Sequence, residues 1–243
     1  MSNQIMLVLS HALAAAWGAG SVVAAGHVLR HARRLFDIQP SLQCDHDDNL
    51  ASSPSARLAT VWILTGAFSS LFLFFLFQNP WKAWFCLAVG TLCLMTALLD
   101  WQEHVVPDLF VAGLVALAGV LWLAEGFPLL EHLIAALLSG LAMAGLMWLS
   151  AWRRLARRPD VDDIAWGDVT LISGLGILIG LQWLALFWAL VGPAHGMLHL
   201  CTRKGRAAAR SGEPLPMAPA LCIAGYGTFL AIHLEWLPSL TNI

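Results

Sequence analysis

Apolar residues fall in long, separate runs along this chain, at about residues 5–29, 57–77, 82–100, 106–124, 129–150, 168–201 and 217–236. Most of these runs approach the roughly 20 residues that a helix needs to cross a bilayer. The run at 168–201 is too long for one straight crossing, and Gly180-Leu181-Gln182 offers a break in it. Because the alternating pattern of membrane barrel strands is absent, we predict an all-α polytopic membrane protein with about eight transmembrane helices.

Composition supports this prediction, since 59% of the 243 residues are hydrophobic, only 12% are charged, and the mean hydropathy is +0.73. A typical soluble domain has roughly 25% charged residues. The first apolar run could be taken for a signal peptide, but its positive residues, Arg30, Arg33 and Arg34, follow it instead of preceding it. We therefore expect a retained anchor with its N-terminus outside.

The basic residues predict the orientation of the remaining helices. With the N-terminus outside, the inside loops are 30–56, 101–105, 151–167 and 202–216, and the C-terminus is again outside. Of the 13 lysines and arginines, all except Lys82 lie in or beside these loops. Since positive residues in short loops stay in the cytoplasm, this bias also supports a break at Gly180.

Two aspartates stand at the membrane boundaries that this topology places on the cytoplasmic side. Asp100 ends one apolar run and Asp168 begins another. A carboxylate is costly to keep at such a boundary, which makes both residues functional candidates. Two carboxylates in one partly desolvated site share a proton and can act as base and acid together, as in aspartic proteases. The alternatives are helix caps paired with nearby arginines, or a transporter component that uses both aspartates for proton or cation coupling.

The other candidate residues have structural explanations that need no catalytic role. Gly174, Gly176 and Gly180 predict a face for close helix packing. His195 and His199 lie one helical turn apart, and without a clear third ligand we expect packing or interhelical hydrogen bonding. The cluster Cys44-Asp45-His46-Asp47-Asp48 holds only one cysteine, so a structural zinc site is not expected there. We predict no metal site.

Four segments resemble conserved motifs of one family, in the same order along nearly the whole chain. They are Gly20-Ser21 through Arg30, Asp100 followed by Pro107-Asp108, Asp162 through Ala165-Trp166-Gly167-Asp168 to Leu171, and Leu215-Pro216-Met217-Ala218-Pro219-Ala220-Leu221. The family is that of the prepilin peptidases, or type IV leader peptidases, which are membrane aspartic proteases of the GxGD type.

The resemblance implies a GxGD aspartic protease bundle in the bacterial inner membrane. Such an enzyme removes the short basic leader of type IV prepilins, or of the pseudopilins of type II secretion, at the cytoplasmic face. It also implies roles for particular residues. The catalytic pair would be Asp100 and Asp168; the supporting motif residues Ala165, Gly167, Pro107, Asp108, Gly174, Gly176, Pro216 and Pro219; and the residues associated with substrate or methylation Gly20, Ser21, Arg30 and Asp162.

Three departures from the family pattern bear on activity. Ala165 replaces the first glycine of GxGD, Thr170 stands where lysine is usual, and the loop 30–56 lacks the tetracysteine zinc module. We therefore expect one membrane-embedded peptidase domain over residues 1–243 that needs no cofactor for proteolysis. S-adenosylmethionine would be needed only if N-methylation is retained, which we do not expect. A non-cleaving, pilin-binding family member is a further alternative. No nucleic-acid partner is expected, and the oligomeric state stays open.

Overall fold

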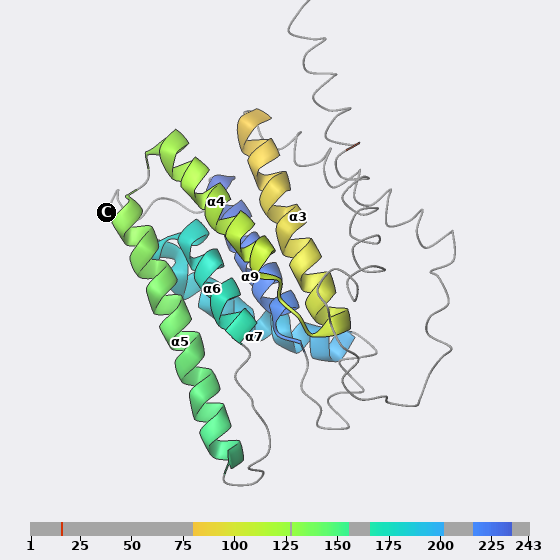
Figure 1. Cartoon of the computed structure of the whole chain (residues 1–243). Helices are drawn as coiled ribbons and strands as arrows, with labels where there is room; N and C mark the ends of the chain where they lie inside the picture. Colours follow the sequence, from red (N-terminus) through yellow and green to blue (C-terminus); the bar gives the residue numbers. More distant parts are fainter. Residues whose placement is uncertain (1–15, 17–79, 127, 156–165, 202–215, 235–243) are drawn as a thin grey trace, which may run out of the picture. The chain divides into compact units, whose positions relative to one another are not determined.

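The computed structural model describes residue 16 and residues 80–126, 128–155, 166–201 and 216–234. The chain divides into two compact units, Met1–Ala88 and Val89–Ile243. All regular structure in the described residues is helical. The elements, labelled as in Figure 1, are α3 (Pro80–Glu103), α4 (Asp108–Glu125), α5 (Leu129–Leu155), α6 (Trp166–Ile179), the 3-10 turn η1 (Leu181–Trp183), α7 (Leu184–Cys201) and α9 (Ala218–His233). The packing described below is that of the second unit, which begins within α3.

The predicted break in the long apolar run is confirmed. Helix α6 ends at Ile179, and Gly180 follows with φ 79° and ψ 167°. This region of backbone space is essentially restricted to glycine. The Gly180 N–H donates to the Gly176 carbonyl at 2.9 Å, which closes the last turn of α6 before η1 turns the chain into α7. The predicted runs at 5–29 and 57–77 lie outside the described residues.

Two predicted loop boundaries were wrong. Helix α5 continues through Leu155, so the predicted loop 151–167 begins later than its apolar pattern indicated. Residues 151–155 contain neither glycine nor proline, and a helix outlasts its apolar run where nothing breaks it. Helix α3 likewise continues to Glu103, so the connection to α4 is residues 104–107 instead of 101–105.

Four helices of the described residues are long and apolar enough to cross a membrane. Their candidate spans are Trp81–Trp101, Asp108–Glu125, Leu129–Ser150 and Leu181–Cys201. Helix α6, with 14 residues, is about 21 Å long, whereas the hydrocarbon core of a bilayer is about 30 Å thick. The total of about eight crossings therefore stays a prediction.

Helix α6 is the centre of the second unit. Helices α4, α5 and α9 each pack against it, and α7 packs against α9 (Figure 1). The α6 side chains Leu171, Ile172 and Leu175 are almost completely buried. A β-carbon at Gly176 would lie 2.9 Å from the carbonyl oxygen of Ala135 in α5, so only glycine permits this approach of the two helices.

The helices of this unit run in two opposite directions. In Figure 1, α3, α5 and α7 run downward along the chain, and α4, α6 and α9 run upward. The last turn of α3, with Asp100, and the first turn of α6, with Asp168, therefore point to the same side of the unit.

The close contact at Gly176 generates a stability prediction. Gly176→Ala should lower the free energy of unfolding by about 1–3 kcal/mol, because the new methyl group overlaps the α5 backbone. The matched control is Gly227→Ala in α9, where a β-carbon meets nothing within 4 Å. The control should gain up to about 1 kcal/mol from the better helix propensity of alanine. Thermal unfolding in detergent checks both, and equal shifts in the two variants would contradict the contact.

Candidate active site

Asp100 lies in the last turn of α3, where its carboxylate is buried with 6% of the residue exposed. Its Oδ2 accepts a hydrogen bond of 2.9 Å from the backbone N–H of Ala218, the first residue of α9. The first N–H groups of a helix have no partner inside the helix, and Met217 at the cap position has no side-chain oxygen to offer them. Asp100 therefore caps α9 from another helix.

Asp168 lies in the first turn of α6 and is also buried, with 7% exposed. Its neighbour Gly167 brings the start of α6 against the α3–α4 connection. A β-carbon at Gly167 would lie 2.9 Å from the β-carbon of Val106. The glycine before the aspartate thus has a steric explanation, since a side chain there would push the start of α6 away from the α3–α4 connection.

The two aspartates interact electrostatically across the α3–α6 junction. Because both are buried and carry charges of the same sign, they cannot both stay ionised at low cost. A single proton shared between them gives one carboxylate that can accept a proton and one that can donate it. The sequence predicted this pairing from residues far apart in the chain.

Two cysteines that sequence reasoning passed over lie beside this pair. Cys222, one turn beyond Ala218 in α9, lies within interaction range of Cys93 of α3 and of both Asp100 and Asp168. Both thiols are buried, with 3% exposed. Cys93 lies two helical turns before Asp100, so helix periodicity places it on the aspartate's face. Nothing in the sequence near Cys222 indicated which helix it would meet.

The prolines of the motifs and Asp108 lie at the starts of α4 and α9. Pro107 is buried at the cap of α4, and its carbonyl accepts the Phe110 N–H at 3.0 Å. Asp108 begins α4 and is exposed. Pro216 and Pro219 are buried on either side of Ala218. Pro216 and Pro219 therefore flank the N-terminus of α9 that Asp100 caps.

Gly174 and Gly176 serve helix packing away from the aspartates. A β-carbon at Gly174 would lie 3.2 Å from a Val111 methyl group of α4, and Gly176 faces α5. Thr170 is exposed, and its hydroxyl donates to the Gly167 carbonyl at 3.0 Å within α6. Five predicted site residues, Gly20, Ser21, Arg30, Asp162 and Ala165, lie outside the described residues, as does the Cys44 cluster.

The histidine pair of α7 bonds within its own helix. The Nε2 atoms of His195 and His199 are 3.2 Å apart, and the rings meet edge to face. No group of three or more histidine, cysteine, aspartate or glutamate side chains in the described part of the chain could hold a metal ion. The two histidines therefore bond to each other within α7. The sequence had indicated packing or an interhelical hydrogen bond.

The cap that Asp100 provides to α9 can be tested without any activity. Asp100→Ala should speed hydrogen exchange at the Ala218 amide and loosen the first turn of α9, because loss of a cap costs about 0.5–2 kcal/mol. Asp100→Asn keeps an acceptor oxygen and should change less. Local exchange is the measurement because removing a charge also relieves repulsion with Asp168, which changes global stability in the opposite direction.

Asp108→Ala, at the exposed start of α4, is the matched control and should leave α9 unaffected. Unchanged exchange at Ala218 in the Asp100→Ala protein would show that the carboxylate does not hold this helix.

Comparison with known proteins supports the resemblance of the motifs. No family model matches the chain, and no solved structure matches it. A prepilin leader peptidase/N-methyltransferase of Dichelobacter nodosus is 27% identical over 177 residues, which cover 72% of this chain. The match spans 58% of the length of that relative. The chain is therefore similar to a protein of the family that its motifs resemble.

Proposed function

We propose that this protein is an aspartic endopeptidase of the bacterial inner membrane that removes the leader of type IV prepilins or pseudopilins. The observation that carries the proposal is the pair of buried, interacting carboxylates, Asp100 and Asp168, at one end of a helical bundle. The similarity to a prepilin leader peptidase/N-methyltransferase supports the choice of substrate. The basic loops predicted at this end support a cytoplasmic active site.

The hydrogen bond at Asp100 suggests how the two carboxylates divide their roles. Asp100 accepts the Ala218 N–H, whereas no group in the described residues donates to Asp168. A hydrogen bond to a charged group contributes about 1.5–3 kcal/mol, more than the roughly 0.3–1 kcal/mol that a helix N-terminus offers Asp168. The negative charge therefore resides on Asp100 and the proton on Asp168.

In the proposed reaction, Asp100 takes a proton from a water molecule as the water oxygen attacks the scissile carbonyl carbon. Asp168 donates its proton to the carbonyl oxygen, and a tetrahedral diol forms. Asp100 then gives its proton to the leaving amine as the C–N bond breaks, and one hydroxyl of the diol returns a proton to Asp168, which restores the starting state. The cycle requires two side chains and one water, so proteolysis needs no cofactor. N-methylation, named for the relative, is not part of the proposal.

The decisive experiment is cleavage of a cognate precursor in membranes, followed by N-terminal sequencing of the product. Asp100→Asn and Asp168→Asn should each reduce leader removal by at least about 10³-fold, since neither amide can exchange the required proton. Glu131→Gln, at an exposed acidic residue in the first turn of α5, is the control and should cleave at the normal rate. Full cleavage by either dyad variant would exclude the mechanism. Binding of the precursor without cleavage by the unaltered protein would favour the non-cleaving alternative.

The shared proton also predicts the pH dependence of kcat/KM. Activity should fall at low pH, where both carboxylates are protonated and no base remains. It should also fall at high pH, where both are ionised and no acid remains. A bell-shaped profile measured with a peptide substrate would support the pair. A profile with a single acidic limb would show that only one carboxylate takes part.

A further inference from the structure

The thiol of Cys222 lies next to the aspartate pair, on its inner side. Cys222 follows Ala218 by one turn of α9, and the Ala218 N–H donates to Asp100 at 2.9 Å. Residues four apart lie on the same face of a helix, so Cys222 belongs to the face of α9 that meets Asp100. The cysteine is almost completely buried, with 3% exposed. Its side chain therefore lies inside the helical unit, one turn deeper than the first turn of α9.

Contacts between α3 and α9 hold Cys222 from both sides. Asp100 bonds to the start of α9, and Cys93 lies within interaction range of Cys222. One turn further along α9, the ring of Tyr226 would lie 2.7 Å from a β-carbon at Gly90. These contacts go back along α3 as they go forward along α9, which fits the opposite directions of the two helices. Cys222 is therefore fixed between the cap and a close helix contact.

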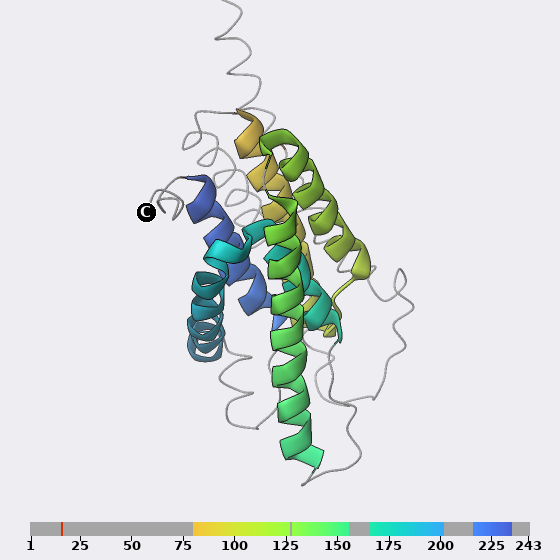
Figure 2. The same cartoon turned by 90° about the vertical axis from the view of Figure 1, so that its left-hand side faces the viewer.

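Helix α6 brings Asp168 to the same level. A β-carbon at Gly225 of α9 would lie 2.9 Å from a δ-methyl group of Leu175 in α6, and the two helices run in the same direction (Figure 2). Asp168 precedes Leu175 by seven residues, as Ala218 precedes Gly225. The first turns of α6 and α9 therefore lie side by side, and Cys222 lies about one turn deeper than either carboxylate.

A thiol is a suitable neighbour for two carboxylates that share a proton. Cysteine packs as a small apolar side chain, and its S–H is only a weak donor. A third negative charge beside two acids would be unfavourable, so Cys222 meets the pair as a neutral group. Removing water from a carboxylate favours its protonated form. A dry wall on the inner side therefore helps the pair to retain its proton.

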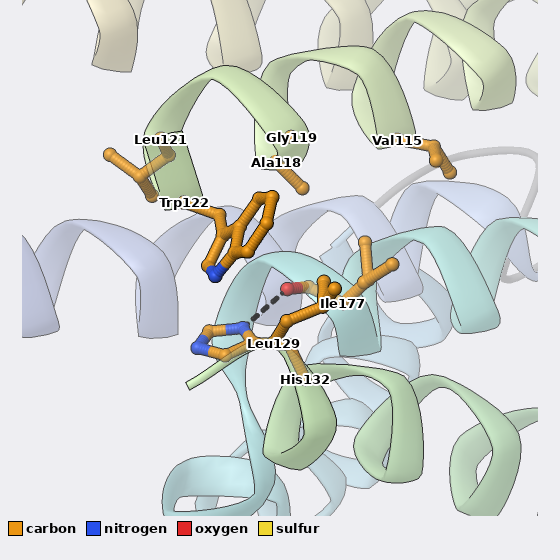
Figure 3. Close-up of a pocket in the computed structure, with 8 residues that line it drawn as sticks. All are labelled: Val115, Ala118, Gly119, Leu121, Trp122, Leu129, His132 and Ile177. Atoms are coloured by element: carbon orange, nitrogen blue, oxygen red, sulfur yellow. Dashed lines mark hydrogen bonds between the residues drawn. The ribbon is translucent and has the colours of Figure 1, made fainter. Parts of the chain in front are cut away.

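The titratable groups that face Cys222 from other helices are Asp100 and Cys93 of α3 and Asp168 of α6. Asp108 at the start of α4 and His104 just before it are exposed. The histidines of α7 bond to each other. His132 of α5 lies at the far end of α6, where its Nδ1 is 2.6 Å from the Ile177 carbonyl oxygen (Figure 3). The two thiols are thus buried, uncharged neighbours of the pair.

We propose that Cys222, supported by Cys93, is a positioning residue that keeps the inner side of the two carboxylates dry. It excludes water from that side and so lets Asp100 and Asp168 share one proton in the pH range of catalysis. This inference rests on the peptidase function proposed above, because it assigns a role within the same site. The polarity of the side chain at position 222 should then matter more than its volume.

Two substitutions separate polarity from packing. Cys222→Ser keeps the size of the side chain and adds a stronger donor, whereas Cys222→Ala stays apolar and removes the sulfur. A hydroxyl that donates to a carboxylate stabilises the ionised form. Cys222→Ser should therefore move both limbs of the pH profile of kcat/KM about one unit to lower pH. Cys222→Ala should leave both limbs in place. If Cys222 served packing alone, the alanine variant would be the more damaged, because it leaves a cavity.

Cys86→Ser is the matched control and should not move the profile. Cys86 is also buried in α3, about four helical turns before Asp100. The protonated carboxyl group can also be followed without substrate, through the pH dependence of its infrared C=O band, which Asp168→Asn removes. This band should titrate about one unit lower in the Cys222→Ser protein. Thermal unfolding checks each variant, and Cys222→Thr and Cys222→Val, which have the same shape, repeat the comparison if Cys222→Ser does not fold.

The two measurements distinguish this inference from the proposed function. If the unaltered protein does not cleave a precursor but the band shifts in Cys222→Ser, the peptidase function is overturned and the role of Cys222 at the pair is supported. If the unaltered protein cleaves but the profile and the band stay unchanged in Cys222→Ser, the role of Cys222 is overturned. Equal shifts in the serine and alanine variants would overturn it as well.

Discussion

A buried carboxylate must find hydrogen-bond donors, and at Asp100 this requirement joins two helices that lie far apart in the sequence. The buried hydroxyl groups of Thr96, Ser139 and Thr228 bond to carbonyl groups of their own helices. Asp100 instead reaches the backbone of Ala218, 118 residues later. One bond thus satisfies a buried acid and an otherwise unpartnered helix N-terminus. It also fixes the end of α3 against the start of α9.

The same constraint explains why Asp100 lies at a helix end. Within a helix all backbone N–H groups are already used, so a carboxylate in mid-membrane would have no donor. At the junction of α3, α6 and α9, free N–H groups and small residues allow two carboxylates to approach one another. Gly167 permits the start of α6 to approach the α3–α4 connection, and Gly176 holds the helix against α5. The packing of Gly167 and Gly176 therefore helps to position Asp168.

The short helix α6 has opposite needs at its two ends. Its N-terminus bears Asp168, while its C-terminus ends before the bilayer would be crossed and leaves carbonyl groups to be satisfied. His132 and Gly180 satisfy two of them. The proposed peptidase site and the bond from His132 thus lie at opposite ends of one central helix. Both ends depend on how α6 is held between α4, α5 and α9.

The sequence alone predicted a helical membrane protein, the apolar helices from 82 onward, the break at Gly180 and two aspartates at helix ends. Hydropathy and glycine conformation are local properties, so they can be read from neighbouring residues. The tertiary structure decided what meets at the site: the cap from Asp100 to Ala218, the thiols of Cys93 and Cys222 beside the carboxylates, and the approach of Val106 to Gly167. These depend on which helix faces approach each other, and the apolar runs of this chain, hydrophobic on all sides, do not mark those faces.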